Sequence, residues 1–206
     1  MNRGRIIALA TLALVFFSQS AHAQGTFIYD QQSGDESAVI GGGVIIQNTQ
    51  PVGQSFTPAL PSVSFVRLAL ADAISGNSLG ATVFVNLLAT SITGSVLGST
   101  SPVAMPDNFG HGSNGVVSFF FPSTVSLTPG TVYYFQPVVL SGDSWVLGAY
   151  NTFNYSGGTA FYNGVAQTFD DVWFREGIVV PEPSTICLGI FGATSFVFIA
   201  RSRRKK

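Results

Sequence analysis

Cysteine and lysine are nearly absent from this chain of 206 residues. The only cysteine, Cys187, lies in an apolar run near the C-terminus, so residues 24–180 can form no internal disulfide and depend on ordinary core packing. The same residues hold two cations, Arg67 and Arg175, and nine acids, which gives a formal charge of 2 − 9 = −7. A basic footprint is therefore missing, and we expect no nucleic-acid partner.

Residues with catalytic potential are also few. No His-Glu-x-x-His motif occurs, and His111 is the one histidine after the first 23 residues. Asp107 and Ser113 lie near it in the sequence, so a triad can be considered. Because glycines flank His111 on both sides, its loop is poorly suited to hold a catalytic base. We predict an exposed loop histidine, no catalytic residue and no enzymatic activity; a secreted hydrolase is the weakest of three hypotheses.

Helical periodicity is missing between residues 24 and 180, and apolar residues alternate instead. Glycine and turn-forming residues separate the alternating runs, and phenylalanine is abundant. The runs predict strands at residues 26–29, 44–47, 54–57, 63–70, 81–89, 96–105, 116–121, 131–140, 144–150, 159–163 and 172–176. Many short strands without crossover helices predict an all-β fold, an antiparallel β-sandwich of jelly-roll-like topology.

Three of these strands should supply the centre of the core. Alternation places every second side chain on one face of a strand, and the two inner faces of a sandwich pack together. The predicted core residues are Val66, Leu68, Leu70, Val83, Val85, Leu87, Val117, Phe119 and Phe121.

The N-terminus has the order of parts found in a secretory signal peptide. Two arginines precede an apolar run over residues 6–17, and Ala21 and Ala23 form a small-x-small cleavage site. The predicted signal peptide is residues 1–23, and cleavage would leave Gln24 as the new N-terminus. The run is too short for a membrane span. Residues 24–179 are then the β-sandwich domain.

The C-terminus, residues 180–206, combines three features. Pro181, Glu182 and Pro183 form a segment that resists helix formation, an apolar run follows over residues 186–200, and a basic cluster ends the chain. The run is at the short end of what a transmembrane helix needs, and the basic cluster would stay on the cytoplasmic side. This ordered set resembles the PEP-CTERM sorting signal of Gram-negative bacteria.

The resemblance implies that a membrane-embedded exosortase recognises Pro181-Glu182-Pro183 and processes the chain there. The inner membrane would then be a transient location, and the mature protein would reach the cell surface or the extracellular matrix. The alternative is a plain C-terminal anchor that is retained.

The body is similar to a widespread exported bacterial jelly-roll module. The residues that carry the likeness are Gly53–Thr57, Leu127–Tyr134, Gly157–Gly164 and Asp171–Arg175. The likeness implies a fold shared with many carbohydrate-binding and adhesive modules, and it carries over no catalytic residue.

Two possible ligand sites follow from the side chains. Aromatic and amide residues gather near one turn: Tyr150, Asn151, Phe153, Asn154 and Tyr155. They could stack and hydrogen-bond a sugar, or the rings could cap one end of the sandwich. Asp170 and Asp171 could hold calcium, or they could be solvated acids. No other cofactor is expected. A body of charge −7 should favour neutral glycans at low salt, unless calcium bridges an acidic chain.

These observations predict an exported structural or adhesive protein of the cell surface or extracellular matrix. The expected partners are exosortase, the inner membrane and exopolysaccharide. A non-catalytic carbohydrate-binding module is the second hypothesis.

Overall fold

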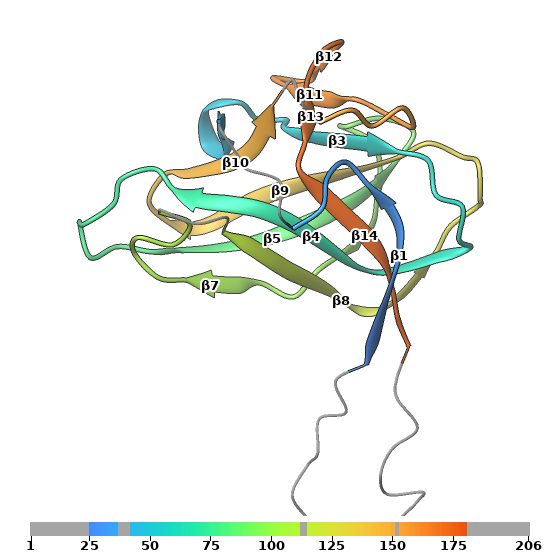
Figure 1. Cartoon of the computed structure of the whole chain (residues 1–206), viewed down its shortest axis with the longest axis horizontal. Helices are drawn as coiled ribbons and strands as arrows, with labels where there is room; N and C mark the ends of the chain where they lie inside the picture. The colour runs from blue at the N-terminus through green and yellow to red at the C-terminus, as the bar shows by residue number, and fades with distance from the viewer. Residues whose placement is uncertain (1–24, 37–41, 112–114, 151–152, 181–206) are drawn as a thin grey trace, which may run out of the picture. The chain divides into compact units, whose positions relative to one another are not determined.

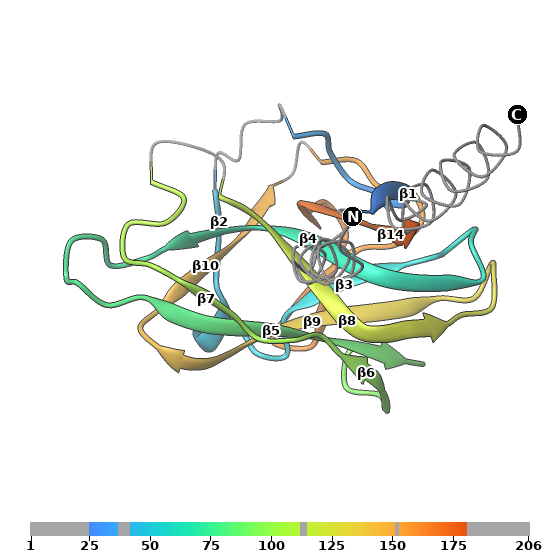
Figure 2. The same cartoon turned by 90° about the horizontal axis from the view of Figure 1, so that it is seen from below.

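The computed structural model describes residues 25–36, 42–111, 115–150 and 153–180 (Figure 1). Residues 27–179 form one compact unit, and residues 1–26 together with 180–206 form a second. Within the first unit, Figure 2 shows two β-sheets as separate layers. Every strand pair with a defined register is antiparallel. The described residues thus confirm the all-β class and the two antiparallel sheets, and the jelly-roll topology stays a prediction.

The first sheet has the strand order β1-β14-β4-β10-β13, with β8 paired to β4 and β2 paired to β10. Its strands are β1 (Thr26–Gln32), β2 (Gly43–Ile45), β4 (Ser62–Asp72), β8 (Val116–Ser126), β10 (Trp145–Tyr150), β13 (Asp171–Val172) and β14 (Phe174–Val180). A short 3₁₀ helix, η1 (Ile46–Asn48), follows β2.

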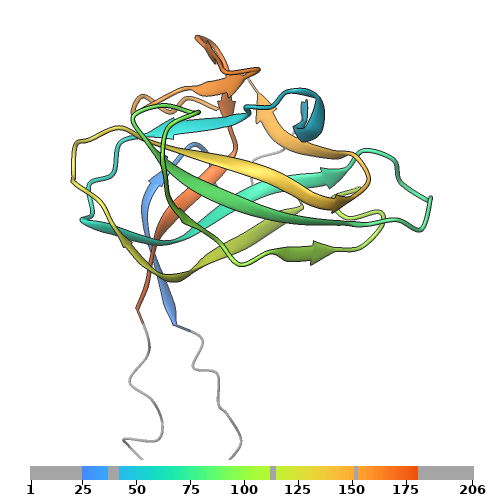
Figure 3. The same cartoon turned by 180° about the vertical axis from the view of Figure 1, so that it is seen from behind.

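The second sheet has the order β12-β11-β3-β9-β5-β6, with β7 paired to β5. Its strands are β3 (Gly53–Phe56), β5 (Ala81–Ala89), β6 (Val96–Ser99), β7 (Val103–Met105), β9 (Tyr133–Gly142), β11 (Ala160–Tyr162) and β12 (Val165–Gln167). Figure 3 shows β5 and β9 running side by side, and their pairing extends from Ala81 to Ala89.

The core lies between the sheets. All nine predicted core residues belong to one buried cluster that takes side chains from both sheets, which confirms the predicted faces of β4, β5 and β8. In register, Phe119 lies opposite Val66 and Val117 lies opposite Leu68, so the two strands present one continuous apolar surface.

The outer face of β4 is covered as well. Phe65 is fully buried, although alternation places it on the side away from the core. The rings of Phe27 and Tyr29 from β1 meet Phe65 edge-on, with centroids at 4.8 and 5.6 Å. Gly177 lies opposite Phe65 in register, and a Cβ there would come within 2.0 Å of the Ile28 carbonyl oxygen. The missing side chain therefore lets β1 lie close to β14.

The predicted strand over residues 96–105 was wrong, because the structure divides it into β6 and β7. Thr100 is buried between them, where its Oγ1 accepts a hydrogen bond from the Val85 amide at 2.9 Å. Its own amide donates to the Val85 carbonyl. Pro102 follows and has no amide hydrogen to continue the ladder.

Two further strand predictions need correction. The predicted strand 172–176 is interrupted at Trp173, which belongs to neither β13 nor β14. The Trp173 amide donates a hydrogen bond to the Gly148 carbonyl oxygen. Strand β12 was missed. Asn163 and Gly164, with φ of 52° and 76°, form the tight turn that joins β11 to β12. Asn-Gly between apolar residues is a strong hairpin pattern, so the sequence did contain the information.

In the described part of the chain, no helix is long and apolar enough to cross a membrane. The predicted signal peptide with Ala21, Ala23 and Gln24, and the predicted C-terminal span, lie outside the described residues.

Candidate functional site

A pocket of about 460 Å³ lies between residues 153–159 and residues 168–171, which the fold brings together. Its lining residues are Phe153, Asn154, Tyr155, Gly158, Thr159, Thr168, Phe169, Asp170 and Asp171. The structure therefore brings three of the five predicted aromatic-amide residues, Phe153, Asn154 and Tyr155, together with the predicted acidic pair. A volume of this size lies within the range of small-ligand sites.

Buried polar groups hold the base of this pocket in place. The Asp171 carboxylate accepts hydrogen bonds from Gln54 Nε2 at 2.6 Å and from the Tyr155 amide at 2.9 Å. Gln54 Oε1 in turn accepts the Val172 amide at 2.9 Å. Burial raises the pKa of Asp171, and the two donated hydrogen bonds oppose that rise. Asp171 thus links β3, β13 and the segment before β11.

Tyr155 is part of the same support. Its ring packs edge-on against Phe174 at 5.1 Å, and its hydroxyl accepts the Thr57 amide and donates to Gln31 Oε1. Burial raises the pKa of Tyr155 to about 12, so its hydroxyl stays protonated at physiological pH. Phe153 is also buried, in a small cluster with Ala69 and Trp173. These two rings fill the interior and offer no open stacking surface.

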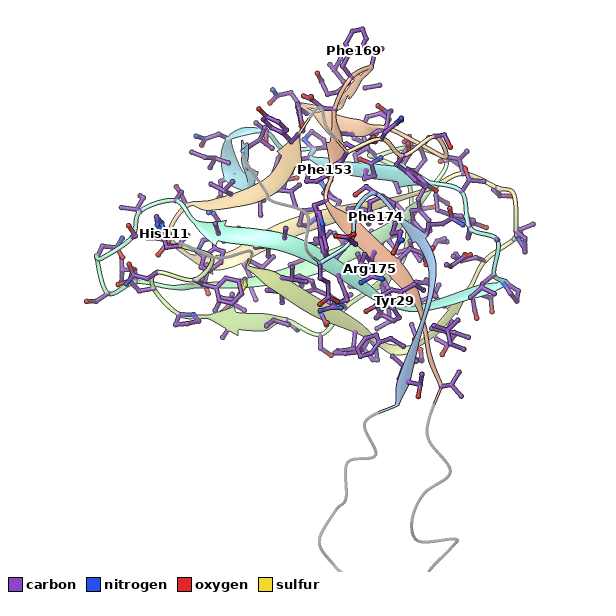
Figure 4. All side chains as sticks on the ribbon, in the orientation of Figure 1. Tyr29, His111, Phe153, Phe169, Phe174 and Arg175 are labelled. Carbon is purple, nitrogen blue, oxygen red and sulfur yellow. The ribbon has the colours of Figure 1, made fainter. Side chains whose placement is uncertain are left out.

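The exposed members of the site are different residues. Phe169 has 85% of its surface exposed and stands at the tip of the molecule in Figure 4. Asn154 is exposed as well and lines the pocket. Tyr150 is partly exposed but does not line it, and Asn151 lies outside the described residues. The sequence reasoning did not single out Phe169, although an aromatic residue directly before Asp170-Asp171 was visible in the sequence.

For calcium, the two predicted ligands are not equivalent. Both line the pocket, but Asp171 is buried and both of its oxygens already accept hydrogen bonds from the protein, whereas Asp170 is only half-buried. The described residues contain no group of three or more His, Cys, Asp or Glu side chains arranged to hold a metal. A calcium site at these positions stays a prediction.

His111 lies beside the last residue of β4, Asp72, and stands apart from Phe153 and Phe169 in Figure 4. Its Nε2 is 3.1 Å from the Asp72 carbonyl oxygen. Asp107 accepts hydrogen bonds from the amides of Gly76 and Ser78, each at 2.9 Å, and so shapes the loop between β4 and β5. Ser113 lies outside the described residues.

One motif was missed in the sequence. Gly76–Gly80 reads Gly-Asn-Ser-Leu-Gly, which matches the Gly-x-Ser-x-Gly spacing of a nucleophile elbow. That elbow requires a turn from a strand into a helix, and here the segment joins two strands, β4 and β5. In the part of the chain that the structure describes, no hydrogen bond joins Ser78 to His111. The motif therefore lacks the structural context that its chemistry needs.

The last described strand, β14, ends at Val180, and the next residues are Pro181, Glu182 and Pro183. A family model described as the PEP-CTERM protein-sorting motif matches residues 179–205. The chain carries a PEP-CTERM sorting motif. The expectation drawn from the tripeptide, the apolar run and the basic end is thereby confirmed. No curated protein and no solved structure matches the chain.

The PEP-CTERM motif implies exosortase-dependent export and sorting to the cell surface, with exosortase as the partner. It covers the end of the chain alone, so the role of the sandwich rests on the sandwich itself.

Proposed function

We propose that this PEP-CTERM protein is a non-enzymatic structural or adhesive component of the cell surface or extracellular matrix. The sorting motif at residues 179–205 carries the proposal, because it begins at the last residues of β14 and leaves the sandwich as the exported cargo. The sandwich, of jelly-roll type in this proposal, is built on a continuous apolar core without any disulfide between residues 24 and 180. Such a body suits a stable, passive role outside the cell.

Processing at the tripeptide is the first part to test. Exosortase would act at Pro181-Glu182-Pro183 after the signal peptide, residues 1–23, has been removed. Two prolines keep the substrate extended outside the bilayer. Because Glu182 is part of the tripeptide that exosortase would recognise, Glu182→Ala should leave a chain in the inner membrane with its basic end attached, as mass analysis of fractionated cells would report. Ser202→Ala, in the same terminal segment, is the matched control and should be processed normally.

The second part is the role of the sandwich. Cells that lack the chain should retain less extracellular matrix and attach more weakly to surfaces, and the wild-type gene should restore both properties. The Glu182→Ala chain should fail to restore them, since it would not reach the surface. If Glu182→Ala were processed and released as the wild type is, exosortase recognition through this residue would be refuted. If the deletion changed neither matrix nor attachment, the structural role would be refuted.

The pocket supports a second candidate function, non-catalytic carbohydrate binding. Phe169 offers an exposed ring for stacking, while Asn154, Thr168 and Asp170 line the same space with polar groups. In this proposal the ligand is a neutral glycan, because most charges of the body are negative.

An array of neutral and acidic glycans, probed with the full chain in neutral detergent, tests this candidate. Arms with calcium and with chelator test the calcium prediction at Asp170 and Asp171. Phe169→Ala should weaken binding to neutral glycans at least fivefold. Val165→Ala, an exposed apolar position on the neighbouring β12, is the control and should have no effect. Equal binding by both variants would remove the pocket from consideration.

A further inference from the structure

The two cations of residues 24–180 lie next to each other. Arg67 on β4 and Arg175 on β14 are direct partners in the register of the first sheet. Like charges placed opposite each other on neighbouring strands destabilise a sheet. Nine acids in the same part of the chain could have paired with two separated arginines. The pairing of both cations at one point therefore calls for a specific anion between them.

An anion of the chain itself occupies that position. Arg67 Nη1 and Arg175 Nη1 both donate to Glu36 Oε1, the latter at 3.2 Å. The Glu36 side chain is 50% exposed, so the carboxylate lies at the surface and within reach of solvent. Arg175 Nε donates to Gln32 Oε1 at 2.8 Å, which helps to hold that guanidinium group in place. The two Nη1 atoms thus form a site that already holds a carboxylate.

Aromatic rings surround the two guanidinium groups. Figure 4 shows Tyr29 beside Arg175, and the Arg175 Cζ lies 3.6 Å from the centroid of the Tyr29 ring. Arg67 Nη1 donates to the Tyr29 hydroxyl at 2.6 Å. Phe27 lies 5.8 Å from Arg67 Cζ and 6.0 Å from the ring of Phe120, which is 43% exposed. Stacking fixes the orientation of the guanidinium groups and places apolar rings next to them.

We propose that this surface binds a uronate-containing acidic polysaccharide. The surface is formed by Phe27, Tyr29, Arg67, Phe120 and Arg175, and we call it the arginine face. A uronate carboxylate replaces Glu36 between the two guanidinium groups, where Arg can bind it in bidentate fashion. The apolar side of the sugar ring packs on Phe120 and Phe27. This site lies outside the pocket described above and does not depend on the function proposed for it.

Binding of an acidic polysaccharide at the arginine face is compatible with a body of charge −7. The overall charge acts over about 30 Å at 0.01 M salt but over only about 8 Å at physiological ionic strength, so local contacts then dominate. At the arginine face two guanidinium groups meet one carboxylate, that of Glu36. Glu36 should therefore act as an internal competitor, and its neutralisation should expose the full site.

The test measures binding of the full chain, in neutral-detergent micelles at 150 mM salt with chelator, to three immobilised polymers. Polygalacturonate supplies carboxylates on sugar rings, dextran supplies neutral sugars, and polyglutamate supplies carboxylates without sugar. The wild-type chain should bind polygalacturonate at least tenfold more tightly than polyglutamate. Arg175→Gln should weaken binding to polygalacturonate at least tenfold and leave dextran binding unchanged. Arg175→Lys should also weaken it, because Lys keeps the charge but loses the planar fork.

Two variants separate the site from a general charge effect. Glu36→Gln should strengthen binding to polygalacturonate at least threefold. Asp170→Asn changes the net charge by the same amount at the pocket and should change this binding less than twofold. Phe120→Ala, at an exposed position that does not threaten folding, should weaken it at least threefold.

Three results would overturn the proposal. The first is the absence of polygalacturonate binding by the wild-type chain. The second is equal strengthening by Glu36→Gln and Asp170→Asn, which would reveal a net-charge effect. The third is polyglutamate binding as tight as polygalacturonate binding, which would assign the face to acidic peptides instead.

Discussion

Glu176 provides the most direct test of the buried electrostatics. The side chain is fully buried on β14, its Oε1 accepts the Gln31 amide at 3.1 Å, and its Oε2 has no hydrogen-bond partner in the described residues. Burial, reinforced by the charge of Asp30, raises the pKa of Glu176 from 4.5 to about 8. We therefore expect Glu176 to be a neutral carboxylic acid in the folded protein at pH 7.

This pKa fixes the sign of the pH dependence. The unfolded chain releases the Glu176 proton near pH 4.5, whereas the folded chain holds it until about pH 8. The stabilisation is therefore complete below pH 4.5 and is lost as the pH rises toward 8. Each pH unit corresponds to about 1.4 kcal/mol, so the loss between pH 5.5 and 8 should be about 3 kcal/mol.

Replacement of Glu176 by Gln removes the proton exchange and keeps the shape of the side chain. The free energy of unfolding of Glu176→Gln should change by less than about 1 kcal/mol between pH 5.5 and 8. At pH 8 the variant should exceed the wild type by about 4 kcal/mol, because the wild type has by then lost the stabilisation over the whole range from pH 4.5 to 8. Urea titration of the full chain in neutral detergent measures this, because Trp145 and Trp173 are fully buried and report unfolding by fluorescence.

Ser202→Ala, which changes no titratable group, is the control and should keep the pH slope of the wild type. Equal wild-type stability at pH 5.5 and 8 would refute the buried neutral carboxyl. The same conclusion would follow if Glu176→Gln retained the full slope.

Three further predictions concern packing and use the same urea titration. Phe119→Ala should lower the free energy of unfolding by about 3–5 kcal/mol, because this ring is fully buried between the sheets. Phe120→Ala, on the outer face, should lower it by less than about 1 kcal/mol. Similar losses for the two variants would show that the faces of β8 are misassigned. Gln54→Ala should cost about 2–4 kcal/mol, because it leaves Asp171 and the Val172 amide each short of one buried partner, and a loss within error would mean that water replaces them. Gly177→Ala should lower the free energy of unfolding by about 2 kcal/mol or more, because the added Cβ would clash with the Ile28 carbonyl oxygen. An unchanged urea midpoint would show that β1 can move away.

The alternation of apolar residues along single strands was sufficient to predict the fold class and the core residues. Alternation in β4, β5 and β8 depends only on the residues of each strand, so it identified the buried faces without knowledge of the partner strands. The C-terminal motif was readable for the same reason, since its tripeptide, apolar run and basic end are contiguous in the sequence. Strand ends were less predictable. Thr100 divides β6 from β7 through hydrogen bonds to Val85, a residue fifteen positions away.

The candidate sites depended on pairings that no local pattern contains. From the sequence, Tyr155 could stack a sugar or cap one end of the sandwich, and contacts with Phe174, Gln31 and Thr57 place it inside the body. Asp171 could be a calcium ligand or a solvated acid; the structure buries it, and Gln54, 117 residues earlier, occupies one of its oxygens.

The sequence by itself determined the C-terminal sorting motif, the all-β class and the inner faces of the central strands, because each is encoded in consecutive residues. The tertiary structure alone decided where charges and polar groups meet. The pairing of β4 with β14 sets Arg67 opposite Arg175, and the position of Glu36 places one carboxylate between them. A sequence shows that these three residues exist, but only the register of strands far apart in the chain can make them one site.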